Sequence, residues 1–284
     1  MDVLGFCIQA RRMEDMSTKY NAVLSIAGSD SGGCAGIQAD IKSISANGGF
    51  AASVITATTA QNTQGVTDIH AIPISHIQAQ LDAVLSDIEF GAVKIGMLHS
   101  PEIIKVVQDT LKSYEVKNII LDPVMVATSG DMLIADETIA SLERFLPHVQ
   151  LITPNIPEAE LLIGHSISLE NIESYAREIG EKFNVSVLLK GGHLEVKDIM
   201  TDMLYLKNED KVVIIHNKAI DTKNTHGTGC SLSSSIATYV SLGLGLEKAV
   251  IKSCKYLNEA IDAGKDKILG KGNGPVDHFY AQRA

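Results

Sequence analysis

The chain has 284 residues, a formal net charge of -10 at pH 7 and a hydrophobic fraction of 45%. This length is enough for one large α/β domain with a sizeable core, and the composition is that of a globular protein rather than a disordered or fibrous one. Duplex nucleic acids are bound by clustered Lys and Arg side chains, and the sequence has no such cluster. We therefore expect no nucleic-acid partner.

The four cysteines form no CxxC pair and the nine histidines have no tight ligand spacing. This pattern predicts reduced thiols in a cytoplasmic protein, without a zinc site. No apolar run is long enough to span a bilayer, so we expect no membrane partner. The first 19 residues do not resemble a signal peptide, because the apolar run 3–8 is short and precedes Arg11-Arg12. We predict a disordered extension over residues 1–19 and one domain over residues 20–284.

From residue 21 onward, short apolar runs alternate with amphipathic stretches. Each run has the length of a buried strand, and polar or glycine-rich residues follow it. The predicted strands are Ala22–Ile26, Ala51–Ala57, Ala92–Ile95, Asn118–Leu121, Leu151–Ile152 and Val185–Leu189.

The amphipathic stretches predict helices between these strands. Ile37, Ile41 and Ile44 recur on one face of a helix that ends at Asn47-Gly48-Gly49. Further helices are predicted from Ser100-Pro101, after Ser168, over Leu232–Leu242 and over Leu246–Ala263.

The alternation of strands and helices predicts an α/β fold with a doubly wound, mostly parallel sheet flanked by helices. Two later runs, Met203–Leu206 and Val212–His216, flank the polar segment Lys207–Lys211. They predict an antiparallel hairpin at the edge of that sheet. Ligands of such sheets bind beyond the carboxyl ends of the strands.

Polar residues stand at the ends of several predicted strands. Turns alone would account for many Gly, Asn and Asp residues at such positions, but Gln61, Asp122 and Lys190 are harder to explain as turn formers. Lys190 closes a strand before two glycines, where it can neutralise phosphate groups as a point charge. We therefore expect the ligand site at this edge.

The segment Gly227-Thr228-Gly229-Cys230 opens the predicted helix near residue 232. Its glycines let consecutive backbone N–H groups turn toward one point, and the helix adds its positive end, which suits a phosphoryl group in transfer. The same dipole favours a thiolate at Cys230, which would then accept a proton from a substrate hydroxyl. The alternative is a glycine-rich helix start beside a small packing cysteine.

A second candidate is the segment Asn155-Ile156-Pro157-Glu158, where Pro157 suits a first helical turn. The amide oxygen of Asn155 and the carboxylate of Glu158 are suited to hold Mg²⁺ through its water shell. The alternative is that Glu158 only complements the helix N-terminus, and on these residues alone that alternative is the stronger.

The loop from Gly28 to Asp40 follows the first strand and enters a helix. Its spacing matches neither GxGxxG nor GxxxxGK[ST], so it is neither a dinucleotide-binding turn nor a P-loop. A loop so rich in small residues lets a substrate lie close to the backbone. Asp40 can receive a donor group of that substrate, or be an ordinary solvated helix residue.

Taken together, these segments resemble the hydroxymethylpyrimidine/phosphomethylpyrimidine kinases of thiamine biosynthesis, within the ribokinase-like superfamily. The resemblance runs from about Ala22 to about Asp277, and its markers are specific as a set. They are Ala27–Gly33, Ala35–Asp40, Thr59–Thr63, Lys94–Leu98, Asp122–Val126, Thr153–Asn155, Leu189–His193 and Gly227–Cys230.

The resemblance implies a ribokinase-like fold and a role for each matched residue. Cys230 would be the base, in a turn formed with Gly227, Thr228 and Gly229, and residues 127–131 would form a mobile flap that excludes water. Asn155, Glu158 and Lys190 would serve Mg²⁺ and the ATP phosphates, with Gln61 and Asp40 on the aminopyrimidine edge. The implied pyrimidine pocket consists of Gly28, Ala35, Asp40, Gln61, Met97 and Val124.

The resemblance therefore implies an ATP-dependent kinase that phosphorylates 4-amino-5-hydroxymethyl-2-methylpyrimidine and then its monophosphate. It also implies a homodimer and leaves a requirement for a monovalent cation open. Most ribokinase-like enzymes have aspartate where this chain has Cys230. Some pyridoxal kinases share the cysteine, so pyridoxal kinase activity is one alternative, and a non-catalytic pyrimidine- or nucleotide-binding protein is another. A nicotinamide-dependent oxidoreductase is disfavoured by the missing GxGxxG.

Overall fold

The computed structural model describes residues 19–125, 135–168, 172–191 and 199–283. Within these residues the strands form one mixed sheet in the order β3-β2-β1-β4-β5-β6-β7-β8-β9. The strands are β1 (Ala22–Asp30), β2 (Phe50–Asn62), β3 (Gly65–Ala71), β4 (Phe90–Ile95), β5 (Ile119–Leu121), β6 (Leu151–Ile152), β7 (Ser186–Leu189), β8 (Ile199–Leu206) and β9 (Lys211–Lys218).

The predicted parallel sheet with an antiparallel edge hairpin is confirmed. Neighbouring strands from β2 through β1 and β4 to β7 run parallel, and β8 and β9 form the hairpin at one edge. An antiparallel strand at the other edge, β3, was not predicted. All seven β3 residues are exposed, so the sequence there lacks the apolar alternation that indicates a strand.

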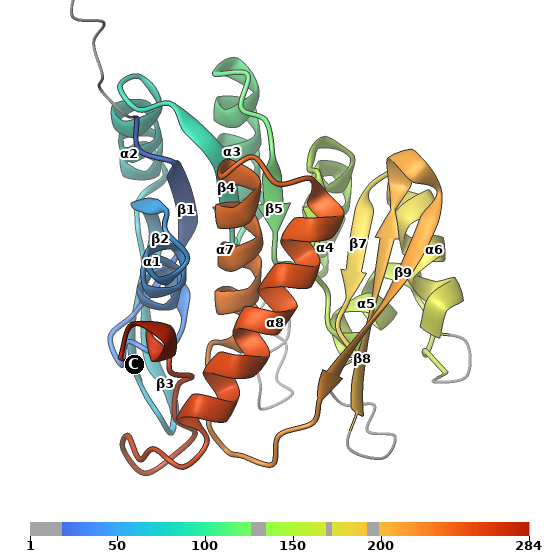
Figure 1. The fold of residues 1–284 in the computed structure, drawn as a ribbon. Coiled ribbons are helices and arrows are strands. Elements are labelled where there is room, and N and C mark those ends of the chain that lie inside the picture. The colour runs from blue at the N-terminus through green and yellow to red at the C-terminus, as the bar shows by residue number, and fades with distance from the viewer. Residues whose placement is uncertain (1–18, 126–134, 169–171, 192–198, 284) are drawn as a thin grey trace, which may run out of the picture.

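Helices cover both faces of the sheet (Figure 1). One layer consists of α1, α7 and α8, and the other of α2 to α6. The helices are α1 (Gly36–Ala46), α2 (Ile74–Leu85), α3 (Pro101–Ser113), α4 (Asp136–Phe145), α5 (Ile156–Ile163), α6 (Ile172–Phe183), α7 (Thr228–Ser241) and α8 (Leu246–Gly264), with short 3-10 helices at Leu146–His148, Lys207–Glu209 and Tyr280–Gln282.

The core is split into two clusters by the sheet. Successive side chains of a strand point to opposite faces, so in β1 Val23 packs in the cluster beneath α7 and α8, while Leu24 and Ile26 pack in the cluster beneath α2 to α6. The inner strands are therefore apolar on both faces, which explains why they appear in the sequence as short continuous apolar runs.

The predicted helix boundaries are confirmed where local capping sets them. Helix α3 begins at Pro101 and the side chain of Ser100 accepts the Ile103 N–H, while α1 ends before Asn47. The predicted cap at Ser168 stays a prediction, because residues 169–171, between Ser168 and the first described residue of α6, lie outside the described residues. The prediction that Ile41 shares the buried face of α1 is wrong, because 39% of Ile41 is exposed.

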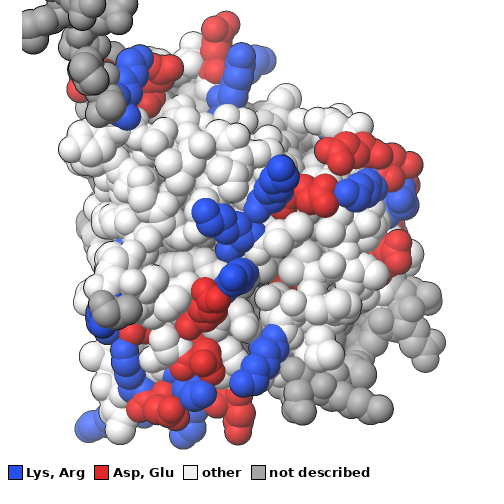
Figure 2. All heavy atoms as spheres, viewed as in Figure 1, with Lys and Arg blue, Asp and Glu red and all other residues white. Residues whose placement is uncertain are grey.

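Charges on the described surface are mixed. Figure 2 shows acidic and basic side chains interspersed on the face that carries α8 rather than gathered into one basic area. Among the described residues, no helix combines the length and the apolar composition that crossing a membrane requires.

The two isoleucines of α1 provide a matched test of the core. Ile44 is fully buried and Ile41 is 39% exposed, although both lie on the same helix. We expect Ile44→Ala to lower the free energy of unfolding by about 2–5 kcal/mol, because it leaves a cavity. Ile41→Ala should cost less than about 1 kcal/mol. Urea unfolding measures both, and equal losses would contradict the described orientation of α1.

Candidate active site

Asp122 and Lys190, two of the polar residues predicted to lie at the strand ends, come together. Asp122 directly follows β5, Thr153 follows β6 and Lys190 follows β7. The Asp122 Oδ1 accepts hydrogen bonds from Thr153 Oγ1 at 2.8 Å and from Lys190 Nζ at 3.0 Å. The carboxylate is buried, whereas 17% of the Lys190 side chain is exposed. Lys190 therefore presents a positive charge at the opening of this edge.

The opposite charges at this edge keep each other ionised. Burial alone would raise the pKa of Asp122, but the ammonium groups of Lys190 and Lys94 outweigh it and lower that pKa below the usual range. Burial likewise opposes the charge of Lys190, yet Asp122 and Glu158 raise its pKa above the ordinary lysine value. Both members of the pair are therefore ionised at neutral pH.

Asn155 and Glu158 lie together at the start of α5. The Asn155 Oδ1 accepts the Glu158 N–H at 2.9 Å, and Glu158 Oε2 accepts the Asn155 N–H at 2.8 Å, which is a capping box. Burial raises the pKa of Glu158 to about 7, with Lys190 opposing and Asp122 adding to the rise. A cation bound near this carboxyl group would favour its ionised form and lower its pKa.

This donor set fits Mg²⁺ better than a metal held by protein ligands alone. Among the described residues, no three His, Cys, Asp or Glu side chains converge on one point. Mg²⁺ is usually bound through one or two carboxylates, several waters and substrate phosphates. Glu158 and Asn155, beside the partly accessible side chain of Lys190, provide such a partial set.

The turn Gly227–Cys230 packs tightly against two other segments. Gly227 has φ +81°, and a Cβ there would lie 1.9 Å from the Cys34 carbonyl oxygen. A Cβ on Gly229 would lie 3.1 Å from Asp122 Oδ2 and 3.4 Å from Lys190 Nζ. The glycines therefore allow the helix start to approach both the loop before α1 and the Asp122–Lys190 pair.

The N–H groups of this turn remain outside the helical ladder of α7. The first helical bond runs from the Ser231 N–H to the Gly227 oxygen at 2.9 Å, and Gly229 and Cys230 precede it. The Thr228 N–H is bonded to Thr225 O at 3.3 Å. The positive end of α7 therefore lies next to the Lys190 ammonium, an arrangement that attracts a phosphoryl group.

The acidity predicted for Cys230 needs correction. Its thiol is half-buried, and burial raises its pKa to about 11, although Lys94 and the Gly36 N–H act in the opposite direction. The helix dipole is a local effect visible in sequence, whereas burial by distant segments is not. With the protein groups alone, Cys230 is a thiol at neutral pH.

Asp40 also differs from its predicted role on the substrate edge. Its carboxylate is completely buried and receives hydrogen bonds from Ser25 at 2.5 Å, from Ser234 at 2.6 Å and from Lys94 at 2.8 Å on each oxygen. A carboxylate has about four acceptor sites, and all are filled. Asp40 therefore cannot contact a substrate directly.

Lys94 is the charged residue that the sequence analysis missed. It lies on β4 with none of its side chain exposed, and its carboxylate partner is Asp40. The available clue was a lysine inside the apolar run of a predicted buried strand. Lysines are almost never fully buried without a partner, so that position required a carboxylate from elsewhere in the chain.

The remaining residues of the predicted pyrimidine pocket lie at the ends of neighbouring strands. The terminal methyl of Met97 lies 3.9 Å from the Cβ position of Gly28. The Val124 N–H donates to the backbone carbonyl oxygen of Asp122 at 2.8 Å, and the Ala35 N–H donates to Asp30 Oδ2 at 2.8 Å. Gly28, Ala35, Met97 and Val124 are all partly accessible.

Gln61 is held in place by its neighbours. Its Oε1 accepts from Thr59 Oγ1 at 3.0 Å, and its Nε2 lies 3.1 Å from His226 Nε2. His226 also lies 3.7 Å from Asp30, whose carboxylate accepts the N–H groups of three residues in the glycine-rich loop. Gln61 is therefore oriented toward the turn before α7. The predicted flap at 127–131 lies outside the described residues.

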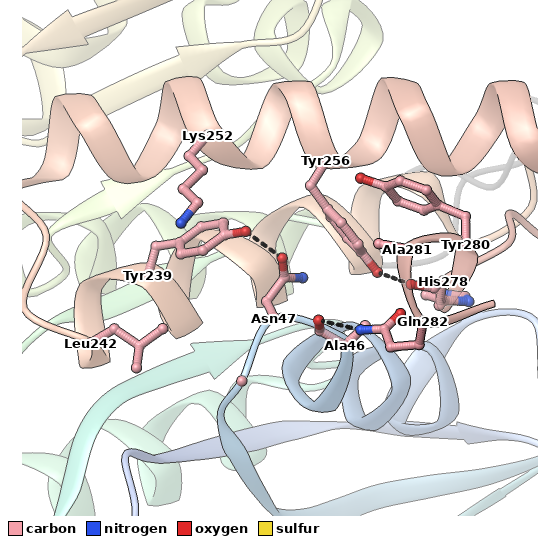
Figure 3. A pocket seen from close by; sticks show the side chains of 11 residues that line it. Ala46, Asn47, Tyr239, Leu242, Lys252, Tyr256, His278, Tyr280, Ala281 and Gln282 are labelled. Carbon is pink, nitrogen blue, oxygen red and sulfur yellow. Dashed lines mark hydrogen bonds between the residues drawn. The ribbon is translucent and has the colours of Figure 1, made fainter. Parts of the chain in front are cut away.

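A separate cavity of about 390 Å³ lies toward the other end of α7 (Figure 3). Figure 3 shows three hydrogen bonds between its walls, from Tyr239 to Asn47, from Tyr256 to His278 and from Gln282 to Ala46. It contains none of the predicted site residues. The strand-end cluster, which combines fixed charges with free helix N–H groups, is the better candidate for chemistry.

Fold and site together define a phosphate-transfer protein of the ribokinase-like class, and comparison with known proteins identifies the family. The family model described as phosphomethylpyrimidine kinase matches residues 30–277, so the chain belongs to that family. It is 45% identical over 260 residues to a hydroxymethylpyrimidine/phosphomethylpyrimidine kinase of Rhizobium meliloti, covering 90% of this chain and 96% of that protein.

Another relative is much longer than this chain. The thiamine biosynthesis multifunctional protein ThiED of Corynebacterium glutamicum is 43% identical over 263 residues, which cover 92% of this chain but only 34% of ThiED. The chain thus spans about a third of that relative's length.

Solved structures support the fold. A phosphomethylpyrimidine kinase of Clostridium difficile superposes with a TM-score of 0.74 at 42% identity, covering 84% of this chain and 99% of that one. The ADP complex of Bacillus subtilis pyridoxal kinase superposes with a TM-score of 0.85 at 28% identity, covering 93% and 99% of the two chains. Both neighbours are kinases, and one of them holds an adenine nucleotide.

Two glycines with the same backbone conformation test the close packing of the turn. Gly227 has φ +81° and a carbonyl oxygen where its Cβ would be, whereas Gly164 has φ +87° and open space. Gly164→Ala should cost about 1–2 kcal/mol of unfolding free energy for the left-handed conformation alone. Gly227→Ala should cost about 1–3 kcal/mol more, because the backbone must move. Equal costs in urea unfolding would show that the described approach is absent.

Proposed function

We propose that this protein is an ATP-dependent kinase that phosphorylates the hydroxymethyl oxygen of 4-amino-5-hydroxymethyl-2-methylpyrimidine and then the resulting monophosphate. The proposal is carried by the Gly229–Cys230 turn, which packs against the ionised Asp122–Lys190 pair at the strand ends. Family membership and the names of the relatives support the substrate. The reaction belongs to thiamine biosynthesis, the process for which the Corynebacterium relative is named.

In the first reaction the substrate hydroxyl oxygen attacks the γ-phosphorus of ATP. A bond forms between that oxygen and phosphorus, and the bond from phosphorus to the ADP oxygen breaks. The hydroxyl proton passes to the sulfur of Cys230 in its thiolate form, the minor form at neutral pH, which the Lys94 ammonium favours. The N–H groups of Gly229 and Cys230 stabilise charge on the transferring group, as does Lys190. In the second reaction the acceptor is already an anionic phosphate, so proton removal matters less.

Lys190, Asn155 and Glu158 would bind the nucleotide phosphates together with Mg²⁺. The metal, held through water by Asn155 and Glu158, would neutralise phosphate charge. Lys190 adds a fixed ammonium beside them. A monovalent cation is a further candidate cofactor. A dependence of the turnover rate on added potassium or sodium salts would reveal it.

The pyrimidine ring would lie against Gly28, Met97 and Val124, with Gln61 directed at its polar edge. Thr59 and His226 fix the Gln61 amide, and a fixed amide discriminates between rings by their donors and acceptors. We place the reaction in the cytoplasm, where free thiols remain reduced, and propose a homodimer.

Pyridoxal kinase activity is the second candidate. The superposition with Bacillus subtilis pyridoxal kinase has a TM-score of 0.85, and pyridoxal also carries a hydroxymethyl group on an aromatic ring. Identity favours the pyrimidine, because the Rhizobium pyrimidine kinase is 45% identical to this chain and the Bacillus pyridoxal kinase is 28% identical. A non-catalytic binding protein would not need Cys230, Glu158 and Lys190 at one edge.

ATP consumption with hydroxymethylpyrimidine, its monophosphate and pyridoxal tests the proposal. We expect kcat/KM for the two pyrimidines to exceed that for pyridoxal by at least about tenfold, because a site that hydrogen-bonds one ring rejects others. Coupled detection of ADP measures all three. Faster turnover of pyridoxal would favour the second candidate, and no ATP consumption with any compound would favour a binding protein.

Replacing Cys230 separates the two phosphorylations. We expect Cys230→Ala to slow the first reaction by about 100-fold or more, the contribution of a positioned base, and the second by less than about tenfold. The buried Cys254 provides the control, since Cys254→Ala should leave both rates within about threefold. Single-turnover assays with each acceptor measure the rates, and equal losses in both would rule out proton transfer to Cys230.

A further inference from the structure

Two helices begin side by side at Cys230. Helix α7 carries this residue in its first turn, and the N–H of Gly36, the first residue of α1, lies against the thiol. The Gly227 Cα and the Cys34 carbonyl are in close contact between the same two segments. The reacting thiol is therefore placed by the spacing between two helix N-termini.

One turn further along, a hydrogen bond joins the same helices. Asp40 is four residues after Gly36 on α1, and Ser234 is four residues after Cys230 on α7. The Ser234 Oγ donates to Asp40 Oδ1 at 2.6 Å, and both side chains are fully buried. Because residues four apart lie on one face of a helix, this bond sits directly behind the pair formed by Gly36 and Cys230.

Lys94 reaches the same carboxylate from the sheet. Its Nζ lies 2.8 Å from both Asp40 oxygens, and it is packed beneath Gly96, where a Cβ would lie 3.0 Å from the nitrogen. With Ser25 on the remaining position, Asp40 has no capacity left for substrate or water. The pair is therefore fixed inside the protein, below the site rather than in it.

We propose that Asp40 and Lys94 are positioning residues of the phosphoryl transfer. Asp40 holds α7 against α1 through Ser234, one turn beyond Cys230, and Lys94 supplies the fixed positive charge that favours the thiolate of Cys230. This inference rests on the proposed function, in which Cys230 accepts the substrate proton.

The charged groups that face Cys230 have opposing effects. Lys94 on β4 and Lys190 after β7 favour the thiolate, whereas Asp40 on α1 and Asp122 after β5 oppose it. Burial is the largest single influence and keeps the pKa high. A buried ion pair is seldom more stabilising than apolar residues of similar volume, so control of the thiol offers a reason for a lysine inside the sheet.

Opposite charge changes distinguish electrostatic control from mere damage to the fold. The initial rate of Cys230 alkylation by iodoacetamide, followed by peptide mass spectrometry at a fixed pH near 8, is proportional to the thiolate fraction. We expect Lys94→Met to lower this rate about tenfold and Asp40→Asn to raise it about threefold or more. The double variant Asp40→Asn/Lys94→Met should return to within about threefold of the unaltered protein.

Ser25→Ala is the matched control, because it removes a hydrogen bond to Asp40 without changing any charge, and its rate should stay within about twofold. Circular dichroism and urea unfolding check that each variant is folded. If Lys94→Met does not fold, the alkylation rates of the other two variants decide the question, and we expect the rate of Asp40→Asn to be higher than that of the double variant. Rate changes of the same sign in both single variants, or changes below twofold in both, would overturn the proposal.

The alkylation assay needs no substrate, so it is independent of the proposed reaction. We expect Lys94→Met to slow the first phosphorylation at least tenfold more than the second, with the loss decreasing as pH rises. Shifts in alkylation without any such effect on turnover would refute Cys230 as proton acceptor while leaving the control of its acidity intact. Unshifted alkylation with intact turnover would refute the positioning role alone.

Discussion

The site depends on how closely two helix starts approach one another. Gly227 lies against the Cys34 carbonyl, and Gly36 lies against the Gly28 carbonyl, where a Cβ would be 2.3 Å from the oxygen. Any other residue at either position would force α1, α7 and β1 apart. The turn that carries Cys230 would then move away from Lys190. The ammonium and the helix N–H groups would no longer act on the same point, and the positive potential there would fall.

The charges at this edge form two pairs of opposite sign, one fully buried and one with a member that reaches the surface. Lys94 is completely buried with Asp40, and Asp122 is buried with Lys190, whose side chain reaches the surface. Each buried charge has a partner of opposite sign, which reduces the cost of removing it from water. The outermost member is positive, and it is the only one of these four that is open to a phosphate.

Local patterns predicted the fold well and the roles of particular residues less well. The inner strands and the caps of α3 follow from short-range rules, so the α/β sheet and the edge hairpin were predicted correctly. Strand β3 was missed because all its residues are exposed. Asp40 and Cys230 were placed near the site, but their environments depend on partners far away in the sequence, such as Lys94 and Ser234, which lie 54 and 194 residues from Asp40. Periodicity and motif spacing contain no information about such partners.

A net charge of -10 is compatible with a site for ATP because net charge and local potential are set by different residues. Acidic and basic side chains are interspersed on the visible face that carries α8 (Figure 2), and exposed pairs are strongly screened by water and salt. Lys94 is fully buried and Lys190 is largely buried, and a charge in such surroundings acts over a given distance much more strongly than an exposed one. Lys190, the cation that reaches the surface at the strand ends, therefore determines together with the N–H groups of α7 what this edge attracts.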